Sequence, residues 1–215
     1  DGVINHIAYA QPALFALAMG LARLWRSWGV ISDVVLGHSV GHYAAACVAG
    51  AFPLAAGVRL LAERGRLFGA LPAGGSMAAV FAAAEVVEAR LAAHPQVSVA
   101  AYNGAHVVIS GPQEEVRALV DSFRDAGHRT EALETSHAFH SVLLEPALDA
   151  FEAEASQLPG ETLTRTLICN RTGKVLGSQT RLDGAYWRRH ARQPVQFAQS
   201  VQTLAELGCR VKPRT

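Results

Sequence analysis

A serine held in a sharp turn is the strongest chemical feature of this sequence. The run 34–36 (Val-Val-Leu) leads into Gly37-His38-Ser39-Val40-Gly41, and an alanine-rich helical stretch follows from Tyr43 to Ala51. A strand, a Gly-x-Ser-x-Gly turn and a helix form a nucleophile elbow, which presents the serine hydroxyl at a helix N-terminus. We expect a Cβ at either Gly37 or Gly41 to clash where strand and helix meet. Ser39 is therefore predicted to do covalent chemistry.

A serine nucleophile needs a base, and the segment Ser-His-Ala-Phe-His-Ser at 136–141 supplies two candidates, His137 and His140. A third catalytic residue is harder to find. The acids that lie between the serine and this loop include Asp121 and Asp125, but both fall on a predicted helix of a small insert, which is a poor place for a triad acid. A Ser-His dyad, with the imidazole oriented by a backbone carbonyl or an amide, fits better.

Three arginines on the next predicted helix, residues 54–71, are candidates for binding the substrate. A fixed guanidinium near a serine nucleophile binds a carboxylate through two parallel hydrogen bonds. Arg59, Arg64 and Arg66 all have the right chemistry, and the residues alone do not choose among them.

The elements that must position these residues belong to two units. Helices are predicted at 11–28, 54–71, 145–158 and, broken at Pro194, 186–205; strands are predicted at 30–36 and 163–170. We expect the first helix to be buried, with Trp25 and Trp28 as core or packing residues rather than a platform for a ligand. Between these elements the order is β-α-β-β-α-β, with strands at 77–81, 97–102, 106–110 and 128–133 and helices at 84–94 and 112–126. The predicted domains are therefore 1–75 with 136–215, and an inserted unit at 76–135.

The net charge and the cysteine content of the chain limit which partners and which cellular compartment we expect. The 215 residues include 19 Lys and Arg and 18 Asp and Glu, so the net charge of +1 gives no reason to expect nucleic acid or a charged membrane. Three scattered cysteines lack metal-ligand spacing, so we expect no metal and a reducing, cytoplasmic location. No apolar run reaches the ~20 residues that span a bilayer. The start at Asp1 and the end at 212–215 both look like cuts within a longer chain.

The chain resembles the acyltransferase domain of modular type I polyketide synthases and, more distantly, the malonyl-CoA:acyl carrier protein transacylases. The resemblance covers nearly the whole chain and rests on several motifs in the right order: Gln11–Ala16, Leu24–Gly29, Gly37–Gly41, Ala62–Arg66, Asn103-Gly104 with Val107–Gly111, Ser136–Ser141 and Arg192–Phe197. It implies an α/β fold, with an α/β-hydrolase-like large subdomain and an inserted ferredoxin-like small subdomain.

The resemblance also implies roles for particular residues. Ser39 becomes the nucleophile, His140 its base, and Arg64 the partner of a malonyl carboxylate. The N–H of Val40 would stabilise the oxyanion, and the backbone carbonyl of Gln196 would orient the base. Malonyl-specific members carry His-Ala-Phe-His in this loop, as here at 137–140. The bulk of the phenylalanine leaves less room for an α-methyl group. Specificity positions are then His137, Phe139, Val40 and His38, and further pocket positions are Gln11, Asn103 and His42.

The implied reaction moves a malonyl unit from malonyl-CoA to the phosphopantetheine thiol of an acyl carrier protein, with no bound cofactor. The implied partners are this carrier protein and the neighbouring ketosynthase and linker of a synthase. Two departures stand out: His42 replaces a usual glutamate, and the loop that supplies a second oxyanion donor is absent. Because one such donor is worth ~2.7–4 kcal/mol in a protease, we expect the chain alone to be weakly active or inactive. Alternatives are a serine hydrolase or editing thioesterase, a non-catalytic docking module, or the loading of a starter unit.

Overall fold

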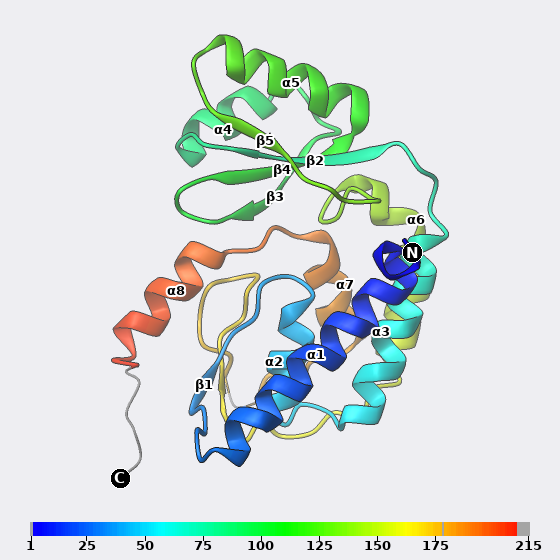
Figure 1. Ribbon diagram of the computed structural model, residues 1–215, viewed down its shortest axis with the longest axis vertical. Helices are drawn as coiled ribbons and strands as arrows, with labels where there is room; N and C mark the ends of the chain where they lie inside the picture. The colour runs from blue at the N-terminus through cyan, green and yellow to red at the C-terminus, as the bar shows by residue number, and fades with distance from the viewer. Residues whose placement is uncertain (1, 178, 210–215) are drawn as a thin grey trace.

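The computed structural model describes residues 2–177 and 179–209. Asp1 and residues 212–215, which suggested a longer chain, lie outside this range. Two units make up the molecule, a small one above a larger one in Figure 1. The predicted boundaries of the insert, residues 76 and 135, stay a prediction.

The small unit is an antiparallel sheet covered on one face by two helices. Its strands are β2 (Gly75–Val80), β3 (Ser98–Tyr102), β4 (Val107–Pro112) and β5 (Thr130–Ala132), in the order β3-β4-β2-β5. Its helices are α4 (Ala84–Leu91) and α5 (Gln113–Asp125). Side chains alternate along the strands, as a sheet between two apolar layers requires. Val80 and Ile109 belong to the core with the helices, while Met77 and Val108 face the other way, toward the large unit.

The large unit surrounds a short parallel pair of strands with helices. It contains α1 (Ile7–Ser27), β1 (Val34–Val35), α2 (Gly41–Val48), α3 (Leu54–Gly69), α6 (Glu145–Ala155), β6 (Thr166–Leu167), α7 (Gly184–Arg192) and α8 (Phe197–Glu206), with 3-10 turns η1 (Val3–Asn5) and η2 (Val142–Leu144). β1 and β6 pair in parallel, with Val34 opposite Thr166. Both strands are shorter than predicted, because only two residues of each form ladder pairs.

A backbone connection joins the two units. The N–H of Tyr102 in β3 donates to the carbonyl of Val195 at 2.8 Å, and the N–H of Val195 donates to the carbonyl of Ala100 at 2.9 Å. The segment between α7 and α8 therefore adds a short parallel bridge to the sheet of the small unit. Met77 and Val108 pack against Val195 in the same seam. The small unit thus holds a segment of the large one in place.

Helix α1 differs from its prediction in burial. It begins at Ile7, and among its side chains only Ile7, Gln11 and Phe15 are buried. Trp25 is 52% exposed and Trp28, just past the end of the helix, is 64% exposed, so neither belongs to the core; their rings pack edge to face on each other, with centres 5.5 Å apart. Helical spacing says which residues share a face, and it does not say that another element covers that face. The exposed apolar side chains include Leu14, Leu17, Leu21 and Leu24.

The same helix also changes the expectation about membranes. α1 has 21 residues and an 18-residue window with a mean hydropathy of 1.3, which is long and apolar enough to cross a bilayer by length and composition. The sequence led us to expect no such segment. In the structure α1 lies along α3 (Figure 1). The ring of Phe15 on α1 occupies the space next to Gly57 on α3.

Candidate active site

The nucleophile elbow forms where β1 meets α2. A Cβ built on Gly37 would overlap the backbone of Gly41 and of His42, so only glycine fits at position 37. A Cβ on Gly41 would have no atom within 4 Å, so the predicted clash at that position is wrong. Position 37 faces the start of the helix, while position 41 faces away from the strand. Ser39 lies at the tip of the turn with φ of 49°.

His140 reaches Ser39 from a loop far along the chain. The distance between Ser39 Oγ and His140 Nε2 is 2.7 Å, and His140 Nδ1 lies 2.8 Å from the carbonyl oxygen of Gln193. A carbonyl can only accept, so Nδ1 carries the ring proton and Nε2 is free to accept from the serine hydroxyl. This is the arrangement of a nucleophile with its general base.

The carbonyl that orients the base belongs to Gln193, and the prediction of Gln196 is wrong. Gln193 is the C-cap of α7, so its carbonyl lies beyond the helical ladder. Gln196 precedes α8, and its carbonyl accepts from the N–H of Ser200 at 2.9 Å and from the Ser200 hydroxyl at 2.7 Å. The first turn of α8 therefore uses the carbonyl that the resemblance suggested for the base.

Backbone strain is concentrated on the reacting pair. Among residues 2–177 and 179–209, Ser39 and His140 are the two non-glycine residues with positive φ, at 49° and 57°. The left-handed region is unfavourable for side chains with a Cβ and is held only where the surrounding structure enforces it. The strained backbone positions are therefore those of the serine and of the histidine that bonds it.

The base is held neutral by its surroundings. Burial and, next, the positive charge of Arg64 lower the pKa of His140 to about 3, while the hydrogen bond to the Gln193 carbonyl acts in the opposite direction. The side chain is 3% exposed. An imidazole in this state can accept a proton from serine at neutral pH because its Nε2 carries none.

Arg64 is a buried cation without an acidic partner. It lies on α3 with 1% exposure, and its Nη1 donates to Gln11 Oε1 at 2.5 Å. Its guanidinium lies 4.7 Å from the ring centre of Phe68 and 5.5 Å from that of Tyr43. In the part of the chain that the structure describes, no carboxylate forms an ion pair with it. A buried charge of this kind is costly until an anion pairs with it.

The other two arginine candidates have a different environment. Arg66 pairs with Glu63 at 2.8 Å and its side chain is 63% exposed. Arg59 is also exposed. Burial on the face of α3 that meets α1 and α2 therefore distinguishes Arg64, which the residues alone could not do.

A cavity of about 260 Å³ brings the serine and this arginine together. Of the predicted site residues it is lined by Ser39, Val40, Arg64, Gln11 and Phe139. Residues that the sequence reasoning missed also line it: Ile7, Ala10, Leu14, Glu134, Thr135 and Ser136. Glu134 and Thr135 directly precede the loop that carries His140, and Ser136 begins it. Their position in the chain was the only feature of the sequence that could have indicated them.

His140 and Gln196 are not among the residues that line this cavity, and neither are four other predicted residues. Asn103 instead bonds His38, with Oδ1 and Nε2 2.9 Å apart, and His42 is completely buried, so the prediction that both line the pocket is wrong. His38 packs against Phe197, with ring centres 5.0 Å apart. His137 Nε2 lies 3.3 Å from the carbonyl oxygen of Leu71. Roles for His38 and His137 in specificity stay predictions.

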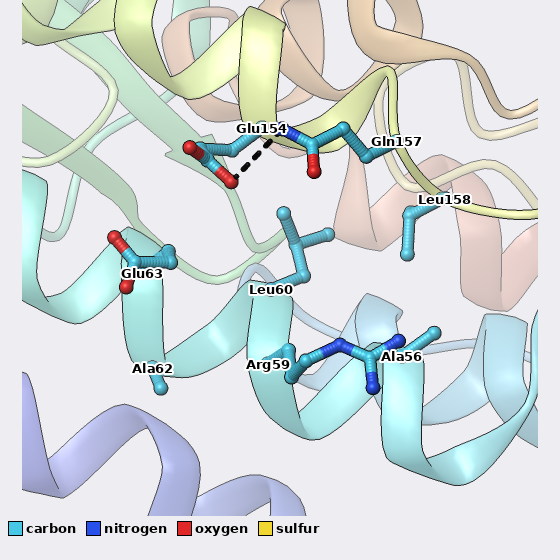
Figure 2. Close-up of a pocket in the computed structure, with 8 residues that line it drawn as sticks. All are labelled: Ala56, Arg59, Leu60, Ala62, Glu63, Glu154, Gln157 and Leu158. Carbon is cyan, nitrogen blue, oxygen red and sulfur yellow. Dashed lines mark hydrogen bonds between the residues drawn. The ribbon is translucent and has the colours of Figure 1, made fainter.

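A different cavity, of about 450 Å³, lies between α3 and α6. Figure 2 shows Leu60 at its centre, with Arg59 and Glu63 on α3, Glu154 on α6 and Gln157 just past the end of α6. It contains no serine or histidine, so we assign the candidate active site to the smaller cavity. No group of three or more His, Cys, Asp or Glu side chains within the described residues is arranged to hold a metal ion.

Comparisons with known proteins agree with this arrangement. The sequence model of a family described as "Acyl transferase domain" matches residues 1–212. The chain is 48% identical over 209 residues to the mycoketide-CoA synthase of Mycobacterium tuberculosis and 42% identical over 209 residues to the polyketide synthase GfsA of Streptomyces halstedii. These matches cover 97% and 96% of this chain but only 5% and 3% of the relatives.

Solved structures show the same likeness. The acyltransferase domain from the second module of the salinomycin polyketide synthase superimposes with a TM-score of 0.90 at 41% identity, over 95% of this chain and 48% of that one. A malonyl CoA-acyl carrier protein transacylase from Clostridium perfringens has a TM-score of 0.90 at 26% identity, over 96% of this chain and 67% of that one. The predicted fold class is confirmed.

Proposed function

Because the chain belongs to the acyl transferase domain family, we propose that it moves a malonyl unit from malonyl-CoA to the phosphopantetheine thiol of an acyl carrier protein, by way of a malonyl ester on Ser39. Acyl transfer follows from the family. The malonyl unit, the covalent intermediate and the carrier protein are the proposed part.

The buried, unpaired guanidinium of Arg64 supports a substrate with a carboxylate. It shares a cavity with the nucleophile, and Gln11 occupies one of its nitrogens while others remain for a ligand. An arginine can bind both oxygens of a carboxylate, and the low dielectric of a buried site strengthens this pairing. An acetyl group offers no such partner. This is the observation that carries the proposal.

The chemistry begins with proton transfer. His140 Nε2 accepts the hydroxyl proton as Ser39 Oγ forms a bond to the thioester carbon of malonyl-CoA. The N–H of Val40 faces the resulting oxyanion. When the carbon–sulfur bond breaks, the coenzyme A thiolate takes the proton from His140, and malonyl-Ser39 remains.

The second half of the reaction is the reverse of the first with a new thiol. The thiol of the carrier's phosphopantetheine arm gives its proton to His140 and attacks the ester carbon. The bond between this carbon and Ser39 Oγ breaks, and the proton returns to the serine. The carboxylate stays paired with Arg64 through both steps, so the acyl group keeps one orientation.

The side wall of the cavity favours malonyl over methylmalonyl. Phe139 lines the cavity together with Ser39, and an aromatic ring there restricts the space around the α-carbon of an acyl group. One methyl group in a pocket changes the selectivity by about 10–200-fold. Starter loading and hydrolysis use the same serine. Preference for acetyl-CoA would indicate starter loading, and release of free acid would indicate hydrolysis.

The partners are proposed from the relatives. The chain spans about 5% or less of the first curated relatives that it matches, and these are named as synthases. We therefore propose that it works beside other domains of a polyketide synthase, including a ketosynthase and a linker, in the cytoplasm.

Competition among acyl donors tests the proposal. The protein is incubated with equal amounts of malonyl-CoA, methylmalonyl-CoA and acetyl-CoA, and the adduct on Ser39 is identified by mass spectrometry, with Ser39→Ala as control. The expected result is a malonyl adduct that disappears when carrier protein is added and reappears on the carrier. Preferential acetyl labelling, or release of free malonate with no acylated carrier, would contradict it.

A further inference from the structure

His42 is the residue of the elbow that the proposed chemistry does not use. It is the second residue of α2, three positions after the nucleophile, and it is completely buried. Its Nε2 lies 2.7 Å from the hydroxyl of Tyr186, which belongs to α7. Neither His42 nor Tyr186 lines the cavity that holds Ser39, so their contact has no direct role in substrate binding. Its place between two elements suggests a different role.

Helix α7 packs on α2 through one aromatic face. Tyr186 and His190 are four residues apart on α7 and point the same way, and Trp187 lies beside them. The ring of Trp187 stacks on Tyr43 with centres 4.2 Å apart, and the ring of His190 stacks on His42 at 5.1 Å. All of these side chains are at most 2% exposed.

One contact in this face is directional. Stacked rings can slide over one another at little cost, whereas a hydrogen bond fixes a distance and an angle. The bond between His42 and Tyr186 therefore fixes the position of α7 along α2. On its other side, the Tyr186 hydroxyl lies 3.4 Å from the Sγ of Cys169, just beyond β6. Tyr186 is thus held between two elements of the large unit.

The end of α7 is where the base is oriented. Gln193 caps this helix, and its carbonyl accepts from His140 Nδ1. The ring of His190, one turn from the cap, also meets the ring of His140, edge to face, with centres 6.4 Å apart. A shift of this short helix would move the carbonyl and the ring contact together.

We propose that His42 is a positioning residue: through its hydrogen bond to Tyr186 it fixes α7, and through Gln193 it sets the orientation of His140 toward Ser39. This role rests on the proposed function for the identity of the acyl donor. The contacts that link His42 to His140 do not depend on that identity. Burial lowers the pKa of His42 to about 3 and raises the pKa of Tyr186, so both partners of the hydrogen bond stay neutral.

Three variants separate positioning from simple packing. His42→Phe and Tyr186→Phe each remove the hydrogen bond while keeping an aromatic ring, and His42→Gln keeps a group that can bond the tyrosine. Phe123→Leu, a fully buried change in the small unit, is the control for general loss of stability. Two measurements are made: the rate at which a fluorophosphonate labels Ser39, and the rate of malonyl labelling with its KM.

The expected result is a fall in both labelling rates by about tenfold or more in His42→Phe and Tyr186→Phe, with KM for malonyl-CoA unchanged, because a misoriented base slows the attack itself. The double variant should be no slower than either single one, since both remove the same bond. His42→Gln should retain most of the rate. If His42→Phe does not fold, Tyr186→Phe carries the test alone.

Nitrogen NMR of the His140 ring provides a measurement that needs no substrate. In the unaltered protein Nδ1 should carry the proton, and in Tyr186→Phe its signal should shift or broaden while that of Phe123→Leu stays unchanged. Labelling rates within about twofold of the unaltered protein, or losses no larger than in Phe123→Leu, would overturn the role of His42. Absence of malonyl labelling in the unaltered protein, with normal fluorophosphonate labelling, would contradict only the proposed acyl donor.

Discussion

The charge of Arg64 acts on the base as well as on a substrate. Burial and then this charge lower the pKa of His140. A carboxylate that pairs with the guanidinium would cancel part of its field, so the pKa of His140 should rise when a dicarboxylic acyl group binds. A substrate with the right acid tail would thereby make its own base stronger, while an acetyl donor would not.

Replacing the arginine tests this coupling. In Arg64→Gln the pKa of His140 should rise, because a positive neighbour that opposes protonation has gone. The measurement is an NMR titration of the His140 ring, run downward in pH as far as the fold persists. Arg66→Gln is the matched control, since that guanidinium is exposed and pairs with Glu63. If the pKa of His140 in Arg64→Gln is unchanged or lower, Arg64 does not act on the base in the way described.

Part of this site could be predicted from residue types and part could not. Ser39 follows from the elbow pattern. The loop at 136–141 gave two candidate bases, His137 and His140, and the family resemblance chose His140. The carbonyl that orients the base could not be predicted, because it depends on where α7 ends and α8 begins, and Gln193 and Gln196 differ only in that respect. Burial of one arginine among three depends on which face of α3 meets α1, which no local pattern encodes.

At the scale of elements, the elbow depends on one of its two glycines. The strand and α2 come closest at Gly37, whereas the space next to Gly41 is open. A methyl group at position 37 must push α2 away from β1, and this displaces Ser39 from His140.

The two alanine substitutions should therefore differ sharply. Gly37→Ala should abolish fluorophosphonate labelling of Ser39 and lower the melting temperature, since a misplaced nucleophile loses about a hundredfold or more in rate. Gly41→Ala should keep most of the labelling rate and gain slightly in helix propensity. Equal loss in both variants would mean that the turn is governed by something other than the contact at position 37.

The order of the elements was predictable, but the surroundings of α1 were not. Turn residues and apolar spacing located the described α-helices and strands to within a few residues, including the β-α-β-β-α-β unit, but not the 3-10 turns η1 and η2. Burial of α1 was inferred from the same spacing and is wrong, because Leu17, Leu21 and Trp25 lie on a face that no described element covers. Whether a face is covered is a property of the whole molecule.

For the molecule as a whole, three buried neutral histidines link stability to pH. In an unfolded chain each imidazole has a pKa near 6.5. Burial holds the pKa of His42 and His140 at about 3 and that of His190 well below its usual value. Between these values the unfolded chain binds more protons than the folded one, so the free energy of unfolding falls as the pH falls.

A steep acid transition should follow. Each of these histidines can remove up to about 1.4 kcal/mol per pH unit below pH 6.5, and whole domains have only about 5–15 kcal/mol to lose. Melting temperatures should be constant above about pH 7 and fall sharply below about pH 6. Scanning calorimetry across this range measures the slope, which should be smaller in His42→Gln than in the unaltered protein. A flat profile down to about pH 5 would count against the burial of neutral histidines as its cause.

The bridge between β3 and Val195 has a consequence for building hybrid proteins. The inserted unit looks like a cassette that could be exchanged between related enzymes at its two junctions with the host. Yet its sheet hydrogen-bonds the segment that includes Val195, two residues after the carbonyl that orients the base. A graft cut at the junctions alone would pair a foreign strand with the resident segment. If the insert is exchanged together with the turn at 193–197, β3 and the segment that it bonds both come from the same parent protein.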